Sequence, residues 1–182
     1  MCSSAEWAEA VERWIIPWVL DTVELGDDVL EVGPGPGITT DVLRSRVPRL
    51  TAIEIHSGLA ASLQERLADT NVEVICGDAT ATGLPSSRFS GAVCLTMLHH
   101  VPSVALQDQL FSEICRLLRP GGVLAGQDSL ASDELRELHV DDTYLPVDPE
   151  GLPRRLEKAG FDAVAVDTNE YAVRFRGHKA AD

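Results

Sequence analysis

Three glycines, Gly33, Gly35 and Gly37, stand at alternate positions directly after the apolar run 27–32. Glycine permits tight turns and lets another molecule approach the backbone closely, so this segment predicts a sharp turn between a strand and a helix. A proline lies between each pair of glycines and has no backbone N–H to donate. The turn therefore constrains both the local fold and the kind of ligand that can approach it.

The rest of the chain continues the alternation of strand and helix that this turn begins. Helices of about ten residues or more between short apolar strands are typical of an α/β fold, in which helices cover both faces of a parallel sheet. The last two predicted strands have no helix between them, which predicts one antiparallel strand near the edge. Strands are expected at 27–32, 50–55, 71–78, 87–98, 122–126, 161–167 and 171–176, and helices at 5–20, 36–47, 57–69, 103–119 and 149–160.

Length and charge narrow the function classes. A chain of 182 residues with 45% apolar residues predicts a single domain, 1–182, preceded by no separate cap domain but opened by a helical segment at 1–24. Its 15 basic and 29 acidic residues give a net charge of −14. This charge disfavours nucleic acid and anionic membrane surfaces as partners.

The sequence also bears on the location of the protein. The N-terminus has no basic region followed by an apolar one, and no stretch approaches about 18 apolar residues. We therefore expect a cytoplasmic protein without membrane insertion. The oligomeric state stays open.

The glycine turn distinguishes between two classes of ligand. In open α/β sheets, ligands bind beyond the carboxyl ends of the strands, next to the turn after the first strand. The dinucleotide pattern G-x-G-x-x-G would put its third glycine at position 38, which is Ile38 here. A pyrophosphate also needs backbone N–H donors, which Pro34 and Pro36 lack. An NAD(P)-dependent oxidoreductase is therefore the less favoured alternative to a protein that binds an adenosyl compound without phosphates.

Three acidic residues at strand ends indicate which adenosyl compound fits. Glu31 lies at the end of the first strand, and Glu54 ends the second, where a carboxylate can accept both hydroxyls of a ribose. Asp78 follows the third strand and can accept from an adenine amino group, with the N–H of Ala79 beside it. Three carboxylates suit a cationic ligand better than an anionic one. S-adenosylmethionine, with its ammonium and sulfonium groups, meets these requirements.

In this order and spacing, the segments VLEVGPGPG, IEIH, GDA, CLTMLHHVP and LLRPGG resemble class I S-adenosylmethionine-dependent methyltransferases. The resemblance is to the small-molecule type, which includes the quinone-biosynthesis methyltransferases, and it covers roughly residues 25–126. It implies a Rossmann-like, doubly wound seven-stranded sheet, mostly parallel with one antiparallel strand near the edge. It also implies that the methionine part of the cofactor lies on the glycine turn. The predicted cofactor-binding residues are Glu31, Gly33, Gly35, Gly37, Glu54, Ile55, Asp78, Ala79 and Thr96.

The predicted function is transfer of a methyl group to O, N or C of a small-molecule acceptor, and a binding module without catalysis is an alternative. The candidates for a catalytic base are His99, His100, Asp141 and Tyr144. Adjacent side chains usually point apart, so at most one of the two neighbouring histidines is expected to face the acceptor. No metal site is predicted, because neighbouring histidines do not easily share one ion and no third ligand is nearby in the sequence.

Two segments outside the resemblance bear on the acceptor. The polar segment 127–148 follows the fifth strand, and we predict that it forms a substrate lid that excludes water and holds a small polar, cationic acceptor. A solvated loop is the alternative for this segment. Trp7, Trp14 and Trp18 have helical spacing, which predicts packing against the core, at a position that also allows them to border the pocket.

Overall fold

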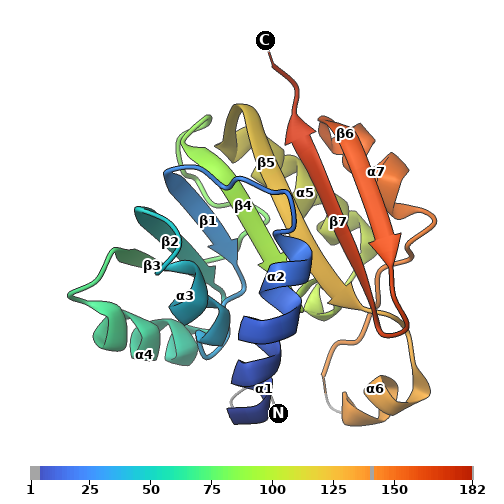
Figure 1. The fold of residues 1–182 in the computed structure, drawn as a ribbon, viewed down its shortest axis with the longest axis horizontal. Helices are drawn as coiled ribbons and strands as arrows, with labels where there is room; N and C mark the ends of the chain where they lie inside the picture. The colour runs from blue at the N-terminus through green and yellow to red at the C-terminus, as the bar shows by residue number, and fades with distance from the viewer. Residues whose placement is uncertain (1–4, 140–141, 182) are drawn as a thin grey trace.

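The computed structural model describes residues 5–139 and 142–181 and shows a seven-stranded sheet between layers of helices (Figure 1). The strands lie in the order β3-β2-β1-β4-β5-β7-β6, and only β7 runs antiparallel to its neighbours. This confirms the predicted α/β class and the single antiparallel strand near the edge. The strands are β1 (Asp28–Val32), β2 (Arg49–Glu54), β3 (Val72–Cys76), β4 (Phe89–Leu95), β5 (Leu118–Ser129), β6 (Phe161–Thr168) and β7 (Ala172–Lys179).

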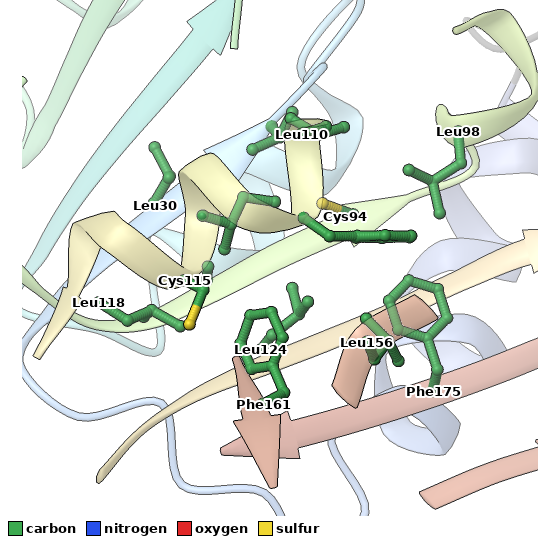
Figure 2. Packing of buried hydrophobic residues seen from close by; sticks show 14 of the residues in the cluster. Leu30, Cys94, Leu98, Leu110, Cys115, Leu118, Leu124, Leu156, Phe161 and Phe175 are labelled. Atoms are coloured by element: carbon green, nitrogen blue, oxygen red, sulfur yellow. The ribbon is translucent and has the colours of Figure 1, made fainter. Parts of the chain in front are cut away.

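Helices cover both faces of the sheet because its central strands bury alternate residues on opposite sides. In β1, Leu30 packs into the core under α5 and α7, whereas Val29 packs into the core under the N-terminal helices and α3. Figure 2 shows the first of these cores, where Leu156 of α7 lies beside Phe175 of β7 and Leu110 belongs to α5. The helices are α1 (Ala5–Ala10), η1 (Val11–Ile15), α2 (Ile16–Val19), α3 (Ile38–Leu43), α4 (Ser57–Leu67), η2 (Leu98–His100), α5 (Val104–Leu117), α6 (Asp133–Leu138) and α7 (Leu152–Ala159).

The N-terminal segment departs from the single helix expected over residues 5–20. It is divided into α1, the π-helical turn η1 and α2, whose first turn contains Pro17. Trp7 and Trp18 pack against the core, but Trp14 is 72% exposed, so the prediction of core packing is wrong for Trp14. Within the described part of the chain, no helix has the length and apolar character needed to cross a bilayer.

Strand β5 is longer than the sequence pattern predicts. The irregular segment was expected to begin at residue 127, but β5 continues through Ser129. Gln127 and Asp128 are buried in this strand. Their side chains are hydrogen-bonded there, Gln127 to the Thr96 hydroxyl just after β4 and Asp128 to the His99 ring in η2. Polar residues at the end of a buried strand give the same sequence signal as a loop. The segment contains the short helix α6, which the side chain of Ser132 caps.

The strand order places one edge of the sheet where a ligand is expected. β1 lies between β2 and β4, so the order of the strands reverses there. The carboxyl ends of β1 to β5 meet at the same edge, because these strands are all parallel. In α/β sheets of this kind, the crevice at such a reversal is the usual ligand site.

Candidate functional site

The glycine turn after β1 is held by its own backbone donors. The Gly33 N–H donates to the carbonyl oxygen of Ile53 at 2.9 Å, and the Gly35 N–H donates to Glu54 Oε2 at 3.0 Å. The Gly37 N–H bonds back within the turn at 3.0 Å. All three glycines have positive φ, which explains why glycine is required. Since these N–H groups are already engaged, the turn is poorly equipped to bind a phosphate.

The glycines differ in what surrounds them. A Cβ atom on Gly37 would lie 2.4 Å from Leu63 Cδ2 and 2.5 Å from Arg66 Nη2, so this glycine allows α3 to pack closely on α4. A Cβ atom on Gly35 would meet no other described atom within 4 Å. Gly35 is therefore the glycine that borders open space, where a ligand can approach the backbone.

Two adjoining cavities lie over the ends of β1, β2 and β3. The first has a volume of about 420 Å³, and the second, about 220 Å³, is mainly apolar. They share four lining residues, Gly33, Ile55, Met97 and His100. Of the predicted cofactor-binding residues, Gly33, Gly35, Glu54, Ile55 and Thr96 line the first cavity and Asp78 and Ala79 the second, whereas Glu31 and Gly37 line neither.

Glu54 connects the end of β2 to the glycine turn. Its Oε1 accepts from the His56 N–H at 2.8 Å while Oε2 accepts from the Gly35 N–H, and the residue is only 5% exposed. These two bonds fix the carboxylate at the wall of the larger cavity and leave it further lone pairs for a ligand. Asp78 is fixed in a similar way, because its Oδ1 accepts from the Thr80 N–H at 2.8 Å.

Glu31 is a buried carboxyl beneath the glycine turn. It accepts a hydrogen bond from the Thr39 hydroxyl, and its Oε2 has no hydrogen-bond partner among the described residues. Burial raises the pKa of Glu31 to about 7, and the hydrogen bond from Thr39 opposes that rise. Because Thr39 itself lines the larger cavity, Glu31 is placed to respond to charge bound there.

A third cavity, of about 190 Å³, lies beside the first, and we call it the acceptor-side pocket. It shares Trp7, Thr96 and His100 with the larger cavity. Thr96 has a φ of +53°, an uncommon conformation for a residue other than glycine, and its N–H donates to the Gln127 carbonyl at 2.8 Å. The remaining lining residues are His99, Ser129, Leu135, Leu138, His139 and Tyr144.

His99 and Asp128 form a buried pair at this pocket. His99 Nδ1 lies 2.6 Å from Asp128 Oδ1, and the backbone N–H of His99 donates to Oδ2 at 3.3 Å. His99 is 4% exposed and Asp128 is fully buried. The carboxylate holds the proton on Nδ1, so that Nε2 is the nitrogen left to accept a proton or bind a ligand. Sequence reasoning missed Asp128, because residues 127–148 were read as an irregular segment.

The pocket gathers more histidines than the sequence predicts. His99 and His100 both line it, because the tight turn η2 leaves their ring centroids only 4.1 Å apart. Which of the two faces the acceptor stays a prediction. His139, from the loop after α6, lies 5.2 Å and 5.3 Å from them between centroids. Burial and the neighbouring His99 lower the pKa of His100. Asp142 opposes this shift, because its Oδ2 lies 3.1 Å from His100 Nδ1.

The other two catalytic candidates have different outcomes. Tyr144 lines the pocket and stacks on His139 with 4.9 Å between ring centroids. Its hydroxyl accepts from the Ser132 N–H at 3.3 Å, which joins the two ends of the segment that contains α6. Asp141 falls outside the described residues, and its predicted role stays a prediction.

Comparison with known proteins identifies the family. Residues 30–126 match a family described as a methyltransferase domain. The ubiquinone biosynthesis O-methyltransferase of Pseudomonas putida (strain W619) is 31% identical over 112 residues, which cover 59% of this chain and 47% of that protein. This chain spans about half the length of the curated relatives it matches.

Solved structures show the same fold. The protein PH0226 of Pyrococcus horikoshii OT3 aligns with a TM-score of 0.82 at 16% identity, covering 98% of this chain and 93% of that one. Phosphoethanolamine N-methyltransferase 2 of Haemonchus contortus, in complex with S-adenosyl-L-methionine, aligns with a TM-score of 0.75 at 15% identity. That alignment covers 99% of this chain and 58% of the nematode protein.

Proposed function

Because the chain belongs to the methyltransferase domain family, we propose that it transfers a methyl group from S-adenosylmethionine to an O, N or C atom of a small molecule. The observation that carries this proposal is the pair of neighbouring spaces at the carboxyl edge of the sheet. One lies on the glycine turn and Glu54, and the other is lined by histidines, with Thr96 bordering both. A methyl donor and a methyl acceptor need this arrangement, since their reacting atoms must meet at one boundary.

The first cavity supports the cofactor assignment. Gly35 leaves room for the methionine part, Glu54 can accept from the ribose hydroxyls, and Asp78 stands beside the apolar cavity where an adenine would lie. The engaged N–H groups of the glycine turn disfavour a pyrophosphate, and with it the NAD(P)-dependent oxidoreductase that the sequence left as an alternative. The Haemonchus contortus enzyme was solved with S-adenosyl-L-methionine on the same fold, which further supports the assignment.

The acceptor-side pocket supports the chemistry. The cofactor supplies a methyl group bound to a positively charged sulfur. When the methyl group forms its bond to the acceptor, the sulfur keeps the electron pair of the broken bond and becomes a neutral thioether. His99 Nε2 takes the proton that the acceptor loses, and Asp128 stabilises the resulting imidazolium through Nδ1. Leu135, Leu138 and Tyr144 exclude water, which would otherwise solvate the nucleophile and weaken it.

A small acceptor fits better than a macromolecule. The acceptor-side pocket holds only about 190 Å³, and the chain has a net charge of −14, which disfavours a nucleic-acid backbone. The segment of α6 and Tyr144 forms a wall of this pocket and acts as the lid over a small polar, cationic acceptor. A related protein carries the name ubiquinone biosynthesis O-methyltransferase, in keeping with a small acceptor. The cytoplasmic location expected from the sequence stays a prediction.

Two measurements test the proposed function. Calorimetry should detect binding of S-adenosylmethionine and no binding of NAD. Transfer of a labelled methyl group to members of a panel of small metabolites should then identify an acceptor. If the protein binds the cofactor but turns over none of a broad panel, the alternative of a binding module without catalysis gains support.

A variant of the buried pair tests the catalytic step. Asp128→Asn keeps the shape of the side chain but removes the charge that stabilises the His99 imidazolium. We expect kcat to fall by about 100-fold or more while cofactor affinity stays unchanged. The pH dependence of kcat should change as well, which a merely structural role for Asp128 would not produce. Wild-type kcat and an unaltered pH profile would remove the His99–Asp128 pair from the mechanism.

A further inference from the structure

The three pocket histidines form a cluster that sequence spacing does not reveal. His99, His100 and His139 each offer one ring nitrogen, and these three atoms all lie within 4.8 Å of one another. The sequence argument against a metal site had two grounds: neighbouring histidines do not easily share one ion, and no third ligand is nearby in the chain. The fold supplies a third histidine from the loop after α6, which answers the second ground. The tight turn η2 bears on the first, because it leaves the rings of His99 and His100 only 4.1 Å apart between centroids.

The Nδ1 atom of each histidine already has a partner. Nδ1 of His99 lies 2.6 Å from Asp128 Oδ1, and Nδ1 of His100 lies 3.1 Å from Asp142 Oδ2. Nδ1 of His139 donates to the carbonyl oxygen of Leu135 at 2.6 Å. Metal-binding histidines are usually oriented in this way, with one nitrogen bonded to a carboxylate or a carbonyl and the other on the ion. The arrangement leaves Nε2 of all three rings available.

We propose that His99, His100 and His139 bind a divalent transition metal ion of the Zn²⁺ class at the wall of the acceptor-side pocket. Imidazole nitrogens suit Zn²⁺ and its transition-metal neighbours, whereas Mg²⁺ and Ca²⁺ prefer oxygen ligands. Three protein ligands leave a fourth position of a tetrahedral ion open. That position is available to a water molecule or to the acceptor, because the same three rings line the pocket.

Binding requires that the cluster contract. Nitrogens on a tetrahedral Zn²⁺ lie about 3.3 Å apart, given Zn–N bonds of about 2.0–2.1 Å. His99 is fixed by Asp128 and by its carbonyl oxygen, which accepts from the Leu145 N–H at 2.8 Å. His100 is exposed and His139 is partly buried, so the side chains of these two histidines carry most of the movement. An ion at this place would tie the α6 segment to η2 and complete the wall of the pocket.

The role of the ion, though not its binding, rests on the proposed function. An acceptor hydroxyl at the open position would have its pKa lowered by the ion and would lose its proton to solvent. The resulting oxygen anion then forms the new bond to the methyl group, and the sulfur of the donor keeps the electrons of the bond that breaks. The proton acceptor role of His99 therefore belongs to the metal-free protein. The site narrows the acceptor class to molecules with an ionisable hydroxyl.

The test titrates metal ions into the chelator-treated 182-residue chain without cofactor or acceptor. Wild-type protein should bind one Zn²⁺ per chain in calorimetry, and Co²⁺ should produce the visible absorption of a tetrahedral nitrogen-ligated ion. His139→Gln should lower the affinity at least 100-fold. His178→Gln is the matched control and should leave it unchanged, because His178 lies on β7, where its Nδ1 contacts the Gly121 carbonyl oxygen. Equal affinities in the two variants, or no 1:1 binding by the wild type, would overturn the proposal.

Two further variants guard against an unfolded mutant and a nonspecific effect. His100→Gln alters a more exposed ligand than His99 and should also reduce affinity at least 100-fold, with the fold confirmed by thermal melting. Asp142→Asn keeps every ligand but removes an outer partner, and should weaken binding by about 10- to 100-fold. Unchanged Zn²⁺ affinity in His100→Gln would overturn the proposal.

The metal site and the proposed function fail in different ways. One-to-one Zn²⁺ binding that is lost in His139→Gln supports the site even if no acceptor is ever methylated. Methyl transfer by chelator-treated protein at a rate that added Zn²⁺ does not change, together with no ion binding, overturns the site and leaves the methyltransferase intact.

Discussion

The cofactor side and the acceptor side of the site are built by different means. On the cofactor side, a backbone turn and carboxylates at strand ends form the wall, and Glu54 accepts from a glycine only 19 residues away. On the acceptor side, the wall consists of side chains, and the His99–Asp128 pair joins residues 29 apart. The first region joins the turn after β1 to the end of β2, two strands that follow each other in the chain, whereas the second depends on contacts between η2, β5 and the segment after α6.

This difference teaches which substitutions each region tolerates. A backbone turn with positive φ cannot be rebuilt with other residues, so the cofactor side should respond steeply and selectively to single changes. A side-chain wall can vary in composition while the sheet beneath it stays the same. We therefore expect acceptor choice to vary more readily than cofactor choice, and the predictions below test this contrast.

The strongest test of the backbone-built side is Gly35→Val. The added side chain would enter the open space beside the turn, so cofactor affinity should fall more than 100-fold in calorimetry. Gly121→Val is the matched control, because Gly121 also has positive φ and open space around it but lies near the start of β5. Both variants should lose a similar amount of stability, about 1–2 kcal/mol from backbone strain. A loss of stability in Gly35→Val without a loss of affinity would show that the turn is merely structural.

Glu54→Ala tests the carboxylate that joins the turn to the ligand. We expect the affinities for S-adenosylmethionine and its demethylated product to fall alike, by about 1.5–3 kcal/mol or roughly 10- to 150-fold, because both ligands keep the ribose. Calorimetry measures both values. Glu65→Ala removes an exposed carboxylate from α4 and serves as the control. Equal cofactor affinity in the two variants would contradict the role given to Glu54.

Glu31 tests whether buried charge tunes the cofactor side. Its pKa is raised from 4.5 to about 7, so the folded state keeps a proton that the unfolded chain has lost between these pH values. The stability that the protonated Glu31 contributes to the folded state is fully present below pH 4.5. The free energy of unfolding then declines as the pH rises toward 7. At pH 6 the cost is on the order of 2 kcal/mol, from 1.36 kcal/mol per pH unit. Denaturant titrations should show that Glu31→Gln removes this decline.

Cofactor binding should also change the ionisation of the Glu31 carboxyl. A bound cation beside Thr39 favours ionised Glu31, so binding near pH 6 should release a proton and tighten as the pH rises. Calorimetry in buffers with different ionisation enthalpies measures this proton, and Glu31→Gln should abolish its release. Identical proton release in wild type and variant would separate Glu31 from the cofactor.

The same contrast explains what could be predicted from the sequence. The α/β class and the antiparallel strand near the edge follow from the local alternation of strand and helix. Gly35, Glu54 and Asp78 lie at the strand ends where the sequence predicts them, because the spacing of these residues reports the geometry directly. Asp128 and His139 could not be found in this way. Their roles depend on contacts with η2, which no short-range pattern encodes, and a polar residue at the end of a buried strand resembles a loop residue.

Tyr144→Phe should have the smallest effect, and it tests the side-chain wall. The hydroxyl accepts from the Ser132 N–H at 3.3 Å, and its loss should loosen the α6 segment while the ring still stacks on His139. A single neutral hydrogen bond contributes about 0.5–1.5 kcal/mol, so the acceptor KM should rise about 2- to 10-fold, with cofactor affinity within twofold. Tyr171→Phe, at a position that is 73% exposed, is the control. A change in cofactor affinity with no change in acceptor KM would contradict the separation of the two sides, because Tyr144 would then belong to the region built from the backbone.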